Sequence, residues 1–274
     1  MHRDDGTFIW WHADRNRFDI GTILDPNMPH SLTTLLLAQR QAGTQLTDLP
    51  ADLVPQDLAT AYAIQDETVA ALGPIGAWKV SPMPETGTPF CSPIPAFSVH
   101  QSGSDLRRAD YADFGIEVEV AVTLARDLPA RETDYTPADL RGAIASVHVA
   151  LELLASRYAD RSKVPQLVNF ADLQSNGCVV LGPRVDPTTL PEFGNQELNL
   201  YLDDALAETK PGGATTENVL AALAWLANHV VGRGLMLKAG DVIITGARIG
   251  PVPFAGKVAR AEAPCLGVVS ATFS

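Results

Sequence analysis

The sequence predicts an α+β chain: a mixed, mostly β fold with helices packed around it. It contains many short apolar runs, frequent Pro and Gly residues between them, and only a few segments with helical periodicity. The strands and helices do not alternate as they would in βαβ units, which argues against a parallel, doubly wound sheet. With 274 residues and 46% apolar content, the chain can bury a large core.

Apolar residues at helical spacing mark the helices. In HSLTTLLLAQRQAG, the side chains of Leu32, Leu35 and Leu36 form one stripe, which predicts a helical lead-in after Met28. Thr136, followed by a proline, has the residue types of an N-cap and a first helical position. The predicted helices are this lead-in and the segments 55–72, 136–146 and 216–231.

Apolar residues with a period of two mark the strands. In FGIEVEVAVTL, Glu117 and Glu119 lie on the face opposite the valines. In VHVALELL, the same alternation places His148 and Glu152 opposite the aliphatic face. The predicted strands are IGAWKV, FGIEVEVAVTL, VHVALELL, GCVVLG, ELNLYL, DVIITG and LGVVSATF.

The first 27 residues differ from the rest of the chain. They mix aromatic with charged residues and show no sustained period, whereas Met28 resembles a natural start. We therefore expect residues 1–27 to be a peripheral N-terminal extension and residues 28–274 to form a single domain with a helical lead-in. Burial of Trp10 and Trp11 in the main core would contradict this expectation.

Charge and cysteine content restrict the partners and the compartment. A formal net charge of −12 argues against nucleic acid or an anionic membrane as a partner. No apolar run reaches the length of a membrane-spanning helix, and the chain does not open with a signal-like segment. Cys91, Cys178 and Cys265 are widely spaced and odd in number, which favours unpaired cysteines in a reducing compartment. We expect a cytoplasmic protein that acts on a small molecule.

Glu117, Glu119 and Glu152 are acids inside apolar, β-patterned segments. The first two lie roughly 6.5 Å apart on one strand face. Three such carboxylates cannot stay ionised side by side without a counter-charge. Either they lie apart on a solvated edge, or a divalent cation joins them, and oxygen ligands of this kind suit Mg²⁺ or Mn²⁺. His148 would be either a fourth ligand or a hydrogen-bonded packing residue.

An ordered set of motifs resembles the fumarylacetoacetate hydrolase superfamily, and within it the 2-keto-4-pentenoate hydratase and 4-oxalocrotonate decarboxylase family. The resemblance extends from about Ala59 to Phe273. It includes the E-x-E pair with the later Glu, IGAWKVSP for the family's G-x-K segment, and LELLASRYAD for its acid and S-R motif. ADLQSNGCVVLG resembles D-N-A-S-S-G-x-x-V-L-G, and AALAWLANHVVGRGLMLKAGDVIITG resembles the C-terminal helix, turn and strand.

The resemblance implies both the fold and the roles of the central residues. The fold would be a β-roll or sandwich like the C-terminal domain of fumarylacetoacetate hydrolase, and the three glutamates would hold Mg²⁺ or Mn²⁺. Lys79 would be the active-site lysine. Because three glutamates and one divalent ion leave a residual negative charge, its ammonium is the candidate partner of a substrate carboxylate. Ser175 would bind the substrate or position the added water, although a serine in Q-S-N-G can also bond its own backbone.

Asp172, Thr245 and Arg248 are the residues expected to bind the substrate. Thr245 ends the run DVIITG, where it would either present its hydroxyl to a ligand or form a turn. Arg248 stands where many relatives carry a smaller residue. The segments 80–82 and 173–176 also depart from the family pattern, which leaves the exact substrate open.

The implied activity is that of a metal-dependent hydro-lyase of the 2-oxopent-4-enoate hydratase type. It would add water to a 2-hydroxy-2,4-dienoate in the catabolism of aromatic compounds. The same site also suits decarboxylation of a 2-oxo-enedioate or hydrolytic C–C cleavage of an acylpyruvate, although the His–Glu pair that relatives use for cleavage is not evident. A metal-binding or partner protein without catalysis is an alternative of another class, against which the retained acids and Lys79 argue. Relatives commonly self-associate, so a homo-oligomer is expected.

Overall fold

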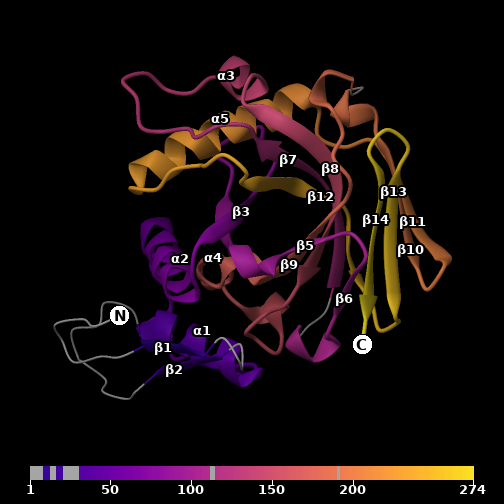
Figure 1. Cartoon of the computed structure of the whole chain (residues 1–274). Coiled ribbons are helices and arrows are strands. Elements are labelled where there is room, and N and C mark those ends of the chain that lie inside the picture. The colour runs from indigo at the N-terminus through magenta and orange to yellow at the C-terminus, as the bar shows by residue number, and fades with distance from the viewer. Residues whose placement is uncertain (1–8, 13–16, 21–30, 112–114, 190–191) are drawn as a thin grey trace.

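The computed structural model describes residues 9–12, 17–20, 31–111, 115–189 and 192–274. Within these ranges the chain forms two large β-sheets with helices around them, which confirms the predicted α+β class (Figure 1). None of the described helices is both long and apolar enough to cross a membrane.

The larger sheet has seven strands in the order β4-β3-β12-β7-β8-β9-β5. Strand β7 pairs antiparallel with both β12 and β8, and β8 pairs antiparallel with β9, whereas β3 pairs with β12 in parallel. The bounds of these strands are β3 Ile75–Val80, β4 Cys91–Pro95, β5 Val99–Gln101, β7 Gly115–Leu124, β8 Ile144–Leu154, β9 Asn176–Leu181 and β12 Val242–Pro253.

The smaller sheet has five strands in the order β11-β10-β13-β14-β6 and stands on the right in Figure 1. Its strands are β6 Ser104–Leu106, β10 Glu197–Leu202, β11 Ala205–Pro211, β13 Val258–Ala263 and β14 Gly267–Phe273. The main hydrophobic core contains residues of both sheets and of helix α5 (Thr216–Gly232), so the two sheets share one interior.

Strand β7 follows the predicted alternation. Ile116, Val118 and Val120 point into the main core. Ala121 points to the opposite face of the sheet, where it joins Ala150 and other small apolar residues in a separate cluster. Because alternate residues of a strand share a face, Glu117 and Glu119 lie on the side of Ala121.

The helices lie in two groups. Helices α1 (Ser31–Ala42), α2 (Leu58–Leu72) and α4 (Gln166–Ala171) pack around an apolar cluster of their own, in the lower left of Figure 1. Helix α5 and the short helix α3 (Pro137–Arg141) lie at the top. Thr136 caps α3 as predicted, but the predicted end near Ser146 is wrong, because residues from Ile144 onward pair with β7 as part of β8.

The N-terminal segment contains a hairpin that the sequence does not predict. Strand β1 (Ile9–His12) pairs antiparallel with β2 (Arg17–Ile20). Most of the segment 1–27, and the side chains of Trp10 and Trp11, lie outside the described residues. The peripheral character of this segment therefore stays a prediction.

Candidate metal centre and active site

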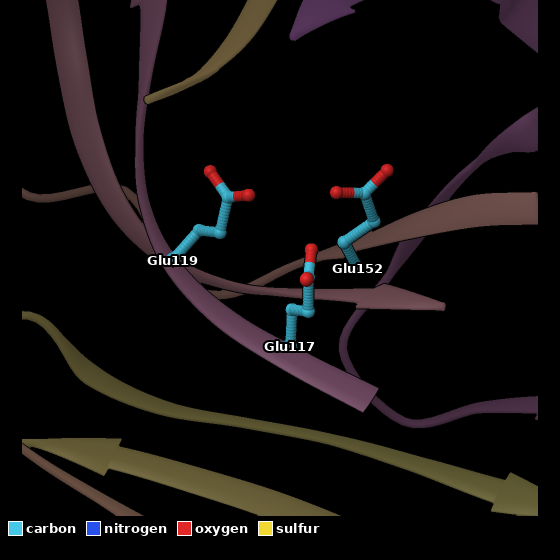
Figure 2. Close-up of side chains that lie close together, drawn as sticks. All are labelled: Glu117, Glu119 and Glu152. Carbon is cyan, nitrogen blue, oxygen red and sulfur yellow. The ribbon is translucent and has the colours of Figure 1, made fainter. Parts of the chain in front are cut away.

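Three carboxylates converge on one face of the larger sheet. Glu117 of β7 lies directly opposite Glu152 of β8 in the antiparallel register, and Glu119 lies opposite Ala150. Each of the three offers a carboxylate oxygen, and these oxygens all lie within 4.8 Å of one another. Figure 2 shows the carboxylates turned toward a common space. Since Glu119 is 1% exposed and Glu152 is fully buried, the solvated-edge alternative is wrong.

Burial and mutual repulsion disfavour the ionised acids. Burial and the neighbouring Glu152 raise the pKa of Glu117 to about 7, although Lys79 and Arg161 oppose the shift. The pKa of Glu119 lies well above its ordinary value, because it is buried and close to the other two acids. Like charges directly opposite each other on paired strands are destabilising. The arrangement therefore has a strong electrostatic preference for a cation.

Lys79, on β3, supplies one cation to this cluster. Its ammonium donates to both oxygens of Glu152, at 2.7 and 2.9 Å, and to the carbonyl of Gln174 at 3.4 Å. Burial alone would lower the pKa of Lys79, but the three acids outweigh burial and raise it. The structure thus brings Lys79 into the predicted site, where it is paired with Glu152.

Backbone and amide donors complete the environment of the acids. The N–H of Gly246, at the bend of β12, donates to Glu119 at 2.7 Å. Gly246 has a φ of +94°, and a Cβ at this position would lie 2.5 Å from Cδ of Pro82. The side chain of Asn176 donates to Glu152 at 2.8 Å. Asn176 could not be identified as a site residue from the sequence, because its contact with Glu152 depends on the pairing of β8 with β9.

His148 lies on the same strand face as Glu152, but its ring nitrogens form hydrogen bonds with other residues. Its Nε2 lies 3.0 Å from the hydroxyl of Thr123 and 2.9 Å from that of Ser146, and its Nδ1 lies 3.0 Å from the carbonyl of Gly182. Both ring nitrogens are thus used within the protein. This identifies His148 as a hydrogen-bonded packing residue.

Two predicted residues lie next to β9 but have protein partners. Both carboxylate oxygens of Asp172 are engaged by Arg157, through its Nε and its backbone N–H. The charge of Asp172 is thus already paired within the protein, and its role in substrate binding stays a prediction. Ser175 is 2% exposed, and its hydroxyl donates to Oδ1 of Asn169 at 2.8 Å.

The other two predicted residues lie on the bend of β12. The hydroxyl of Thr245 donates to the carbonyl of Val120 at 2.7 Å, so its proton is already used within the protein, and its role in substrate binding stays a prediction. Arg248 is 7% exposed and donates through one terminal nitrogen to the carbonyls of Thr245 and Gly246. Its Nε and second terminal nitrogen are buried and have no hydrogen-bond partner among the described residues. Burial lowers the pKa of Arg248, and the charge of Glu119 partly offsets this effect.

The donor set fits a hard divalent cation. It consists of carboxylate oxygens from three acids, which are the ligands that Mg²⁺, Mn²⁺ and Ca²⁺ take in proteins. The elevated pKa values of Glu117 and Glu119 show that a positive charge at this position would relieve repulsion. These residues form a candidate metal site.

Relatives with assigned names resemble most of the chain. A 2-keto-4-pentenoate hydratase from Burkholderia vietnamiensis is 35% identical over 196 residues, which cover 70% of each chain. The TodF product hydratase from Pseudomonas putida is 28% identical over 255 residues, covering 88% of this chain and 93% of the relative. A 2-oxo-hept-4-ene-1,7-dioate hydratase from Escherichia coli is 31% identical over 157 residues, covering 55% of this chain and 58% of the relative.

A solved structure shares the fold. The 4-oxalocrotonate decarboxylase from Pseudomonas putida G7, complexed with magnesium and adipate, superposes with a TM-score of 0.76 at 22% identity. The superposition covers 89% of this chain and 97% of that one. The family described as fumarylacetoacetate (FAA) hydrolase C-terminal matches residues 62–273, which include both sheets and all three acids. The chain therefore belongs to the fumarylacetoacetate hydrolase family.

Proposed function

We propose that this protein is a metal-dependent hydratase that adds water to a 2-hydroxy-2,4-dienoate in the catabolism of aromatic compounds. The observation that carries the proposal is the convergence of Glu117, Glu119 and Glu152 beside Lys79. Relatives named as hydratases, at up to 35–37% identity, support the reaction class. Mg²⁺ or Mn²⁺ is the proposed ion.

The proposed roles of the residues follow from their charges. The three glutamates would hold the cation, which supplies positive charge to offset the negative charge that develops on the oxygens of a 2-oxo acid. The Lys79 ammonium would attract the substrate carboxylate into the site. Hydration moves the enol proton to the far end of the diene and adds the OH and H of one water molecule across the remaining double bond.

Ser175 and Gly246 have supporting roles in this proposal. The Ser175 hydroxyl donates its hydrogen bond to Asn169. The hydroxyl oxygen of Ser175 would therefore be able to accept a hydrogen bond from the attacking water. Gly246 holds Glu119 in place through its backbone N–H. Ser175 would thus orient the attacking water and Gly246 would orient the carboxylate of Glu119, while the charges of the site come from the acids and Lys79.

A second candidate, decarboxylation of a 2-oxo-enedioate, is favoured by one observation. Two nitrogens of the buried Arg248 have no partner among the described residues, and they would suit the second carboxylate of a dicarboxylic substrate. The two candidates share the metal site and differ in the group that Arg248 would bind.

Ultraviolet spectra of the purified protein test both candidates. The protein is mixed with 2-hydroxypenta-2,4-dienoate and, separately, with 2-oxohex-3-enedioate, each with and without Mg²⁺. We expect loss of the dienoate absorbance, abolition of this loss by EDTA, and its recovery with Mg²⁺ or Mn²⁺. Turnover of the enedioate alone would establish the decarboxylase, and EDTA-resistant turnover would contradict the metal site.

The proposal extends to location and assembly. A cytoplasmic location is supported by Cys91, Cys178 and Cys265, all of which are free thiols. Self-association is proposed from the family resemblance, and sedimentation of the purified protein tests it.

A further inference from the structure

A short turn before β9 has an unusual backbone. Leu173, Gln174 and Ser175 have φ values of 50°, 51° and 58°, and none of them is glycine. Left-handed conformations bring Cβ too close to the backbone, so L-residues adopt them singly and rarely in succession. Such a turn persists only when its surroundings hold it in place.

Arg157 holds both ends of this left-handed turn. On the N-terminal side, its guanidinium pairs with the carboxylate of Asp172 and donates to the carbonyl of the same residue at 2.9 Å. On the C-terminal side, it donates to the carbonyl of Asn176 at 3.3 Å. The side chains of Arg157 and Asp172 are only 6% and 1% exposed. A single planar group thus fixes the distance between the residues that flank the turn.

The turn presents two groups to the metal centre. The carbonyl of Gln174 accepts from the Lys79 ammonium at 3.4 Å. The carboxamide of Asn176 donates to the same Glu152 oxygen that Lys79 contacts at 2.7 Å. Lys79 and Glu152 are therefore both contacted by residues of the turn, or directly after it, whose two flanks Arg157 holds.

We propose that Arg157 is a positioning residue, which acts through the left-handed turn to fix Glu152 for metal binding and Lys79 for the substrate. This inference deepens the proposed function and rests on it. Arg157 itself contacts none of the three acids through any described hydrogen bond. Its influence passes through Asn176 and Gln174.

The substitution Arg157→Lys tests the inference, because it keeps the charge and loses the planar group that reaches both sides of the turn. We expect Mg²⁺ affinity, measured by calorimetry with the metal alone, to fall by about 10-fold to 100-fold, as for other residues that orient metal ligands. We expect kcat with the dienoate to fall by a similar factor at saturating Mg²⁺, and KM to rise, because Lys79 would attract the substrate carboxylate.

Arg233→Lys is the matched control. Arg233 also forms a two-nitrogen pair with an acid, Asp66, and the two side chains are 10% and 29% exposed. It should lose thermal stability as Arg157→Lys does, but keep metal affinity and kcat. If both variants lose thermal stability but keep metal affinity and kcat, Arg157 has only a structural role and the inference is overturned.

Asn176→Ala keeps the test decisive if Arg157→Lys does not fold. It leaves the Arg157 contacts intact, since these reach the Asn176 carbonyl, and removes only the donor to Glu152. Unchanged Mg²⁺ affinity and kcat in this variant would overturn the inference. A wild-type protein that binds Mg²⁺ but hydrates no dienoate would contradict the proposed function, while the metal-binding comparison would still decide the role of Arg157.

Discussion

At the residue scale, Lys79 and a metal ion would compete for the same oxygens of Glu152. Both oxygens accept from the Lys79 ammonium, at 2.7 and 2.9 Å. In Lys79→Met this competitor is lost, so we expect Mg²⁺ affinity to be retained or to increase. We expect kcat/KM to fall by at least about 100-fold, because the substrate loses its cationic partner.

Calorimetry and steady-state kinetics measure these two effects separately. Lys238→Met, at an exposed lysine outside the site, is the control and should change neither quantity. Normal turnover in Lys79→Met would remove Lys79 from the active site.

Arg248 provides a second prediction at this scale. Its two unpartnered nitrogens would bind the second carboxylate of a dicarboxylic substrate. In Arg248→Met, we expect KM for the enedioate to rise by about 10-fold to 100-fold. This factor corresponds to the free energy of one hydrogen bond to a charged group. The KM for the monocarboxylic dienoate should stay the same. An equal loss with both substrates would mean that Arg248 acts on the part of the site that they share.

At the element scale, the bend of β12 links the fold to the candidate metal site. Gly246 has a φ of +94°, and its N–H donates to Glu119. In Gly246→Ala, the new methyl group would lie 2.5 Å from Pro82, so the bend must shift. We expect lower stability in denaturant unfolding together with weaker Mg²⁺ binding.

Gly240→Ala separates backbone strain from this displacement. Gly240 has a similar φ of +88°, but a Cβ there meets nothing within 4 Å. It should cost about 1 kcal/mol of stability and leave Mg²⁺ affinity unchanged. Equal Mg²⁺ affinity in the two variants would show that Gly246 does not position Glu119.

The strands that carry the acids could be predicted from the sequence because their periodicity is local. Alternation in β7 and β8 correctly separates the valines, which are buried in the core, from Glu117, Glu119 and Glu152. The pairing partners could not be predicted in this way. The contacts of Lys79 and Asn176 with Glu152 depend on strand order and on residues far apart in the sequence.

Other features escaped prediction for different physical reasons. The left-handed turn at Leu173–Ser175 contains no glycine, so nothing in its composition indicates positive φ values. Strand β12 continues past DVIITG to Pro253 through irregular register, which breaks the alternation that would mark it as a strand. Asp172 has the residue type of a binding group, but its partner Arg157 becomes evident only in the folded chain.

At the scale of the whole molecule, metal binding should stabilise the fold in a pH-dependent way. The pKa of Glu117 rises from 4.5 to about 7 without a metal, so over this range the folded protein binds more protons than the unfolded chain. The stability of the metal-free protein therefore falls as pH rises from 4.5 to about 7. Metal requires the ionised acids, so its affinity falls as pH drops below about 7.

Calorimetric melting at two pH values tests this linkage. The Mg²⁺ concentration is held constant at about 100 times the Kd measured at a pH of about 8, where binding adds about 2.7 kcal/mol, or several degrees of Tm. We expect this gain to be larger at a pH of about 8 than at about 6, because fewer protons must then be displaced. In Glu117→Gln, the gain should be small at both values. A gain in the wild-type protein that does not depend on pH would show that the acids are not the ligands.

Because the two faces of β7 have different surroundings, the length of this strand can vary little among members of the family. Ile116, Val118 and Val120 fill the shared interior, while the residues between them carry the acids. Insertion or deletion of a single residue between Val118 and Glu119 would exchange the two faces beyond that point, placing one set of side chains in the other's surroundings. Length variation here is therefore tolerated only in pairs of residues, or where a bulge absorbs the extra one. We expect insertions and deletions among relatives to collect in the loops and to be absent from this strand.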